Sequence, residues 1–223
     1  LYSSLLLIAM LPLLMQAQQG TLDNSFANAG KMIQNVGFAG VDVRVVLQQT
    51  DGKIIVAGSA EQIASSMDFV LARFNTNGTL DNSFDGDGIV RTDINAGSKD
   101  QLLSAVLLPS GKILVAGMGS ENVLVQYNTN GSLDPTFDGD GIFIITSPNN
   151  FTAADMLVQP DGKIVVAGEG ATYPPGYVLV RILPQGGYDN SFDGDGISVL
   201  SLNGDYFTAR AVTLQPADNK LLV

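Results

Sequence analysis

The stretch FVLARFNTNGTLDNSFDGDGIV, residues 69–90, decides the fold because most of it occurs again later in the chain. It returns as NVLVQYNTNGSLDPTFDGDGI at 122–142 and as YVLVRILPQGGYDNSFDGDGI at 177–197. A second motif alternates with it: QQTDGKIIVAG (48–58), LLPSGKILVAG (107–117), VQPDGKIVVAG (158–168) and finally LQPADNKLLV (214–223). Two motifs in a fixed order at one period of about 55 residues indicate a chain built from repeated units.

Each unit contains four apolar or β-branched runs of about five or six residues, bounded by Gly, Pro, Asp and Asn, which is typical of short strands. The expected strands are 43–48, 53–57, 69–74 and 89–94, then 102–108, 112–116, 123–127 and 142–146, then 154–158, 163–167, 178–182 and 197–202, and lastly 209–215. No long segment of helical period follows the N-terminal region, so we predict no helix there.

The turn chemistry joins the run before each DGK-type turn to the run after it as a tight hairpin. In QPDGK, Pro160 presets φ near −65°, Asp161 can bond its own backbone, and Gly162 accepts a positive φ. The glycine that ends each VAG motif (Gly58, Gly117, Gly168) predicts a bulge or a close approach of neighbouring backbones.

Four antiparallel strands, repeated radially, describe a blade of a β-propeller. We therefore predict an all-β chain, a β-propeller of four-stranded blades over residues 20–223. A stacked solenoid is the alternative, although solenoid units usually have shorter periods. A closed propeller needs about four to eight blades. Because the last copy stops at NKLLV, where the others continue VAG, we expect a truncated propeller with further blades in its natural form.

Composition excludes several classes of function. The net charge is −11, with 11 Lys and Arg and no basic cluster, which is a poor match to nucleic-acid binding. The chain has no Cys and no His, so it can form neither disulfides nor a Ser–His–Asp or Cys–His relay. Any metal site must use oxygen ligands, which favours calcium or magnesium.

Residues 1–19 read LYSSLLLIAMLPLLMQAQQ and resemble a signal peptide. The apolar run from Leu5 to Met15 is too short to span a bilayer of about 30 Å but suits an h-region, and Ala17 is a plausible cleavage point. Because the chain starts with Leu1, we expect the basic n-region to be missing. A buried apolar helix is the alternative.

The acidic loop of each unit begins like an EF-hand calcium loop, with oxygen-bearing residues at positions 1, 3 and 5 and Gly at 6. The candidate ligands are Asp81, Ser83, Asp85 and Asp87; Asp134, Thr136, Asp138 and Asp140; and Asp189, Ser191, Asp193 and Asp195. The bidentate Glu of position 12 is absent, since Thr92, Ile145 and Leu200 stand there. Turn chemistry between strands is therefore the competing interpretation, with Phe84, Phe137 and Phe192 as core anchors.

Three other features were weighed as candidate sites. The pairs Asp85/Asp87, Asp138/Asp140 and Asp193/Asp195 could serve glycoside hydrolysis, but an active site is normally unique and these pairs recur once per unit. Arg73 and Arg181 share a repeat position with Gln126, which favours a surface or sheet-edge residue. Lys53, Lys112, Lys163 and Lys220 follow the hairpin turn and are interpreted as solvated turn residues.

Taken together, runs of the type VQPDGKIVVAG (158–168), the stretch FVLARFNTNGTLDNSFDGDGIV and the period resemble the delta-60 repeat family over about residues 20–223. The resemblance implies a β-propeller of unknown function in secreted or surface bacterial proteins, often beside an anchoring domain, and it implies no catalytic residue. The first copy, TLDNSFANAGK, departs from the pattern by lacking DGDG.

We therefore expect a secreted or cell-surface, non-enzymatic scaffold for protein or glycan partners, without nucleic acid, membrane span or cofactor other than calcium. Two alternatives stay open: a calcium-stabilised module of a large adhesin, and a hydrolase or lyase with an acidic site in the central channel.

Overall fold

The computed structural model describes residues 22–32, 40–61, 67–94, 99–146, 151–170, 176–201 and 208–223. These residues form three four-stranded antiparallel sheets and one two-stranded hairpin, and no helix occurs among them. Within the same ranges there is accordingly no helix long and apolar enough to cross a membrane. The signal-like segment 1–19 lies outside the described residues.

The strands occur in chain order, four to a sheet. The first sheet contains β1 (Gly40–Gln48), β2 (Ile54–Glu61), β3 (Met67–Phe74) and β4 (Ile89–Thr92). The second contains β5 (Gln101–Leu107), β6 (Ile113–Met118), β7 (Asn122–Tyr127) and β8 (Ile142–Ile145). The third contains β9 (Phe151–Val158), β10 (Ile164–Gly170), β11 (Gly176–Ile182) and β12 (Ile197–Leu200), and the hairpin contains β13 (Thr213–Leu214) and β14 (Leu221–Leu222).

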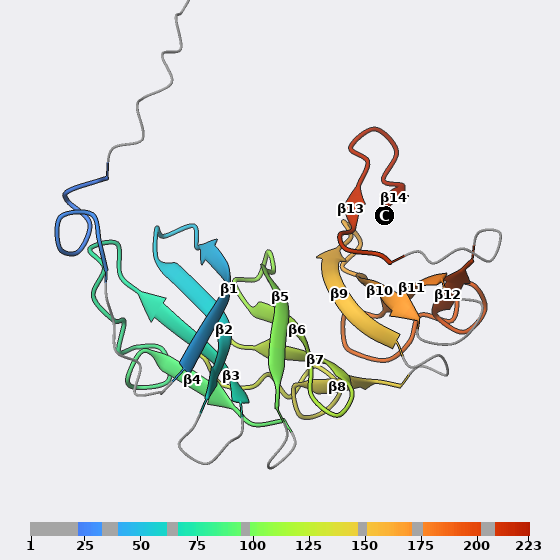
Figure 1. Ribbon diagram of the computed structural model, residues 1–223, viewed down its shortest axis with the longest axis horizontal. Helices are drawn as coiled ribbons and strands as arrows, with labels where there is room; N and C mark the ends of the chain where they lie inside the picture. The colour runs from blue at the N-terminus through green and yellow to red at the C-terminus, as the bar shows by residue number, and fades with distance from the viewer. Residues whose placement is uncertain are drawn as a thin grey trace, which may run out of the picture.

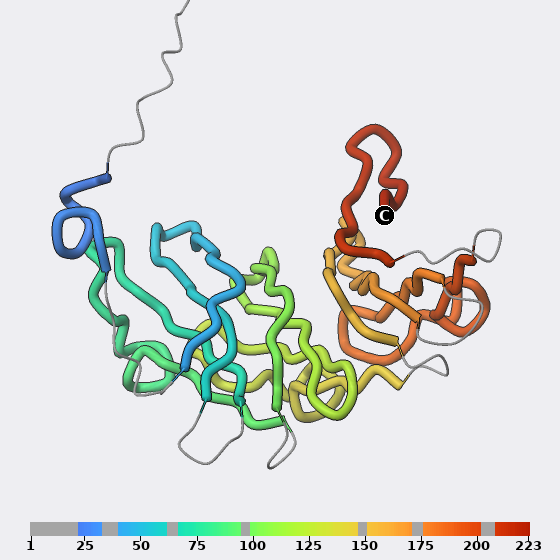
Figure 2. The backbone as a smooth tube through the Cα atoms, in the orientation of Figure 1, coloured from blue at the N-terminus to red at the C-terminus, as the bar shows by residue number. Residues whose placement is uncertain are grey.

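Each sheet is a simple meander whose spatial order equals its sequence order. The first strands of successive sheets contact one another, β1 with β5 and β5 with β9, so they form the inner side of the array while β4, β8 and β12 are the opposite edges. Figure 1 shows the three sheets following one another in an arc. Figure 2 shows residues 22–32 (blue) and the C-terminal hairpin (red) at opposite ends of that arc.

The core lies between successive sheets. Ile55, Leu71 and Phe69 of the first sheet pack against Ile113 and Val123 of the second. Alternate residues of β6 and β7 point the other way, and Leu114 and Leu124 join Val166, Val178 and Val180 of the third sheet in a second core. This use of both faces explains the continuous apolar runs of the sequence, because a strand that is covered on both faces has no polar side.

The predicted hairpin is confirmed between the first and second strands of each sheet. In the third sheet Gly162 has φ +84°, and Asp161 Oδ1 accepts a hydrogen bond from Lys163 N at 3.1 Å. The VAG glycines are explained by both of the expected causes. Opposite Gly58, Gly117 and Gly168 the inner strand carries a register shift. The neighbouring backbone also lies close, because a Cβ on Gly58 would lie 2.1 Å from the Asp42 backbone oxygen and a Cβ on Gly168 would lie 2.0 Å from that of Thr152.

Several strand predictions differ from the structure. The inner strands of the first and third units begin at Gly40 and Phe151, each three residues earlier than expected, and the strands that follow them continue to Glu61 and Gly170. The expected strand 209–215 is reduced to β13, which pairs only with β14.

Candidate functional site

The first Asp of each acidic loop is buried and surrounded by donors. Asp81 Oδ2 accepts from Arg73 Nε at 2.7 Å and lies 3.0 Å from Lys53 Nζ, while its Oδ1 accepts from Ser83 N and Oγ. The Arg73 and Asp81 side chains are 6% and 9% exposed. Arg73 also stacks on Phe84, with its guanidinium carbon 4.6 Å from the ring centroid. We call this group of Lys53, Arg73 and Asp81 the charge cluster of the first unit.

The second and third units repeat this cluster. Asp189 accepts from Arg181 Nε at 2.7 Å and pairs with Lys163 Nζ at 3.0 Å. In the second unit Gln126 replaces the arginine, and Asp134 accepts from Gln126 Nε2 and Lys112 Nζ, each at 2.6 Å. Gln126 carries no charge, but it still donates a hydrogen bond to Asp134. Lys112 supplies the positive charge that compensates this carboxylate.

The cluster holds the first Asp of each loop ionised. Burial alone would raise the pKa of Asp81, but hydrogen bonds from Ser83 and Lys53 and the charge of Arg73 outweigh it and hold that pKa well below its usual range. The same balance, with Lys112 and Gln126 as donors, lowers the pKa of Asp134. The hydrogen bond from Ser191 is the main reason why the pKa of Asp189 is lowered.

Two interpretations drawn from the sequence are wrong in consequence. Arg73 is buried rather than a surface residue, and Lys53, Lys112 and Lys163 are bound to the loop aspartates rather than merely solvated. Lys220, which is 75% exposed and pairs with Asp218, is the one of the four turn lysines that fits the solvated interpretation. The signal that could have revealed the cluster was the joint recurrence of Lys, Arg or Gln, and Asp at fixed positions in every unit.

The second Asp of each loop builds the junction with the next unit. Asp85 and Asp138 have φ of +53° and +52°, and their backbone N–H groups donate to Asn130 O and Gln185 O, each at 2.8 Å. In the first copy Ala27 takes this place, at φ +47°, and donates to Asn77 O at 3.1 Å. The loops that contain Ala27, Asp85 and Asp138 are thus docked by a backbone hydrogen bond onto the NTNG-type turn of the unit that follows.

The remaining loop residues have local contacts. Asp87, Asp140 and Asp195 each accept a hydrogen bond from the backbone N–H two residues on, at the start of β4, β8 and β12. Thr136, like Ser83 and Ser191, donates its hydroxyl to the first Asp of its loop at 2.7 Å. Phe84 and Phe137 are fully buried, as expected of core anchors, and Phe192 is half-buried.

The structure therefore gives the first, second and fourth predicted calcium ligands of each loop a side-chain contact within the protein, whereas Asp85 and Asp138 are bound through their backbone N–H groups. A calcium ion at Asp81 would have to compete with Lys53 and Arg73, and the same holds for Asp189 with Lys163 and Arg181. Calcium binding at the loops stays a prediction. Among the described residues, three carboxylates approach one another within ligand distance at a different place, Asp68, Asp93 and Asp100, which the sequence had not singled out.

Comparison with known proteins identifies the repeat. Residues 49–84, 108–137 and 159–192 each match the model of the family described as domain of unknown function (DUF5122) beta-propeller. Three segments of the chain thus match this β-propeller family, and the predicted fold class is confirmed. No curated protein matches the sequence.

Solved structures share the architecture at low identity. A catalytically inactive virginiamycin B lyase from Staphylococcus aureus, solved with quinupristin, is 14% identical with a TM-score of 0.53; the match covers 84% of this chain and 50% of that one. A protein of unknown function from Bacteroides caccae is also 14% identical, with a TM-score of 0.47, over 83% of this chain and 61% of that one. This chain spans only about half to three fifths of the length of these two proteins.

Proposed function

We propose that this chain is a non-enzymatic scaffold, secreted or at the cell surface, that binds a protein or glycan through one end of its sheets. The observation that carries the proposal is a difference between the two ends of the strands. In a meander, the β1–β2 turn and the β3–β4 loop lie at one end, and the β2–β3 and sheet-to-sheet connections lie at the other.

The sequences at the two ends behave differently. At the first end, which we call the repeated end, the DGK turns and acidic loops recur from unit to unit. Their residues form the charge clusters and the junctions between units. At the other end, the variable end, the connections do not recur: they read QIASS, GSE and ATYPP within the sheets, and DINAGSKD, TSPNN and SLNGDYFTARAV between them. Irregular connections on a regular framework are where binding residues usually lie.

Two further points support the proposal. The signal-like character of residues 1–19 supports export. The carboxylate pairs that could have served hydrolysis recur in every unit, and a repeated group is better explained by the framework than by a single reaction centre. The lyase activity named for the Staphylococcus aureus protein is not carried over, because a likeness at 14% identity concerns the fold alone.

The proposal is tested by measuring binding of the purified chain to a glycan array and to a panel of purified extracellular proteins. Ligands that bind are then titrated against two matched double variants. Glu61→Lys with Glu121→Lys changes exposed residues at the variable end, and Thr76→Lys with Thr129→Lys changes exposed residues at the repeated end. We expect the first pair to weaken binding at least tenfold and the second pair to leave it unchanged.

Two results would contradict the proposal. Binding that only the Thr76 and Thr129 changes abolish would place the ligand at the repeated end. Conversion of a bound glycan or peptide to products during prolonged incubation, seen by mass spectrometry, would show an enzyme rather than a scaffold.

A further inference from the structure

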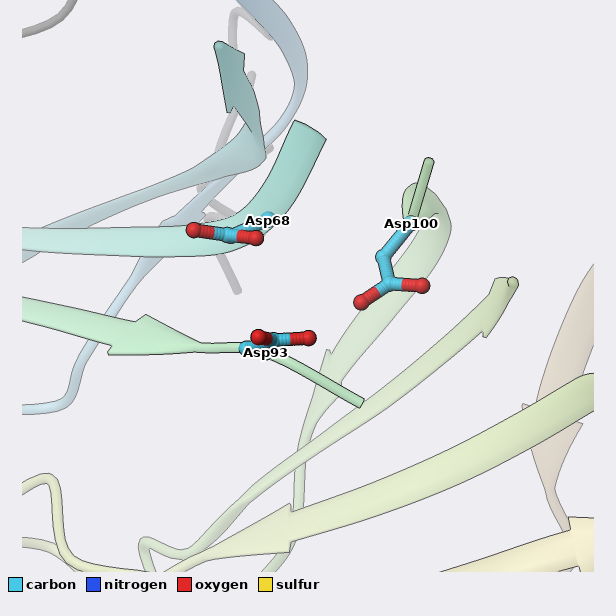
Figure 3. A group of neighbouring side chains, drawn as sticks. All are labelled: Asp68, Asp93 and Asp100. Atoms are coloured by element: carbon cyan, nitrogen blue, oxygen red, sulfur yellow. The ribbon is translucent and has the colours of Figure 1, made fainter. Parts of the chain in front are cut away.

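Three carboxylates meet at the junction between the first two sheets, at the variable end (Figure 3). Asp68 is the second residue of β3 and Asp93 directly follows β4. The pairing of Phe69 with Thr92 places these two aspartates opposite each other across the sheet. Asp100 directly precedes β5 and is held there by its backbone N–H, which donates to Met67 O at 2.7 Å. Two elements of one sheet and one of the next therefore bring three acids together.

The arrangement is electrostatically unfavourable for the protein alone. One carboxylate oxygen from each residue lies within 4.8 Å of the other two, and like charges opposite each other destabilise a sheet. Asp100 is fully buried and Asp68 is 5% exposed. Burial, together with the charges of Asp93 and Asp100, raises the pKa of Asp68.

A second observation indicates that something is missing from this cluster. Asp68 Oδ1 is buried and has no hydrogen-bond donor among the described residues. One carboxylate oxygen of Asp68 lies within 4.8 Å of an oxygen of Asp93 and of an oxygen of Asp100, and Figure 3 shows the three side chains grouped together. An orphaned carboxylate oxygen in the interior destabilises the folded protein, so such groups are normally paired, protonated or bound to a cation. By contrast, Asp100 Oδ2 accepts from Ile94 N at 2.8 Å, which fixes that side chain at the edge of the cluster.

The cluster is also unique among the units. The strand register shows which residues of the other units take the places of these three aspartates, and no aspartate is among them. Asp68 is replaced by Glu121 and Gly176, Asp93 by Thr146 and Ser201, and Asp100 by Phe151. The turn and loop aspartates recur because every unit needs them. These three do not recur, so the repeated framework gives no reason for their presence.

We propose that Asp68, Asp93 and Asp100 bind a calcium ion that joins the first sheet to the second. Three carboxylates without nitrogen or sulfur ligands suit a hard cation. Calcium–oxygen distances of about 2.3–2.6 Å allow one ion to reach three oxygens that lie within 4.8 Å of one another, and calcium accepts a flexible arrangement of ligands. Water completes the coordination on the side of the exposed Asp93.

The site is tested with the whole 223-residue chain after removal of metal by a chelator. Isothermal titration with calcium chloride is expected to show one ion per chain, and saturating calcium is expected to raise the Tm by roughly 5–10 °C. Asp93→Asn, a change at an exposed position, should weaken calcium binding at least tenfold and remove the Tm shift. Asp68→Asn should do the same and, without metal, should melt above the wild type because it removes the repulsion.

Matched controls separate this site from the acidic loops. Glu121→Gln changes the counterpart of Asp68 in the second unit, and Asp87→Asn changes an exposed loop carboxylate; both should bind calcium as the wild type does. The proposal is overturned if millimolar calcium neither binds nor shifts the Tm, if Asp93→Asn retains binding, or if Asp87→Asn loses it. Tighter binding of magnesium than of calcium would overturn the identity of the ion.

Discussion

The aspartates of the acidic loops have different roles according to their burial. The buried ones are Asp81, Asp134 and Asp189. Each of them holds a lysine that comes from the hairpin turn of its own unit. Residues about 22–28 positions apart in the chain are therefore tied by one carboxylate. The exposed Asp87, Asp140 and Asp195 of the same loops instead accept hydrogen bonds from backbone N–H groups two residues further on.

Asp81→Asn is expected to lower the free energy of unfolding at pH 7 by roughly 3 kcal/mol, because it leaves Arg73 buried without its anion. The pH dependence has a definite sign. The folded pKa of Asp81 lies below the unfolded value of about 3.9, so its stabilisation is complete above about pH 5 and is lost as the pH falls toward the folded pKa. Urea unfolding of wild type and variant between pH 7 and 2 measures this.

The difference in free energy of unfolding between the wild type and Asp81→Asn should therefore shrink steadily below about pH 5. Asp87→Asn is the control, since the Asp87 side chain is 57% exposed and Asn can still accept from Ile89 N. We expect it to change the stability by no more than about 0.5 kcal/mol. A constant difference between wild type and Asp81→Asn down to pH 2 would argue against the charge cluster.

Residue-level prediction from the sequence succeeded where one residue type has one local use. Gly162 in the turn and Phe84 in the core are such cases, and both were confirmed. It failed for Arg73 and Lys53, because whether a charge is solvated depends on which strands meet. Asp68, Asp93 and Asp100 were missed because they come together only through the β3–β4 register and the approach of β5.

At the scale of elements, the loop after β3 is a connector between units. The turn after β7 contacts it so closely that a Cβ on Gly131 would lie 2.7 Å from Val90 Cγ2 and 3.1 Å from the Phe84 ring. The strands, their order and the hairpins could all be predicted from period and turn chemistry. The docking of a loop onto the next turn could not, because it uses backbone atoms that carry no sequence signature.

Gly131→Ala and Gly139→Ala separate this contact from backbone strain. Both glycines have nearly equal φ, +94° and +93°, but a Cβ on Gly139 meets nothing within 4 Å. Both variants should lose about 1–2 kcal/mol to left-handed strain. Gly131→Ala should lose about 1–3 kcal/mol more through overpacking, measured by urea unfolding. Equal losses of stability in the two variants would mean that the turn after β7 and the loop after β3 are not closely packed.

For the molecule as a whole, the described sheets are unequally covered. β6 and β7 contribute side chains to the cores on both of their faces. On β1, by contrast, Val43 and Val46 are 52% and 63% exposed, and β12 to β14 are only partly buried. Stability is therefore concentrated in the middle sheet.

Hydrogen exchange followed by mass spectrometry should show this distribution directly. We expect the amides of β6 and β7 to exchange at least tenfold more slowly than those of β1, and β13 and β14 to exchange fastest, because opening frees less buried apolar surface at the ends. Peptides from β2 and β3, in the same sheet as β1, serve as internal references for overall unfolding. Equal protection in all three sheets would show that the array opens only as one body.

The junction between units has a genetic consequence. Its donor and acceptor are backbone atoms, and the acceptor already belongs to Asn77, Asn130 or Gln185 at successive junctions. A duplicated DNA segment of about one period would encode both halves of the connector, a loop that donates and a turn that accepts. Recombination between copies could therefore lengthen or shorten the array without any matching change in neighbouring side chains, so blade number can vary among related genes more freely than blade sequence.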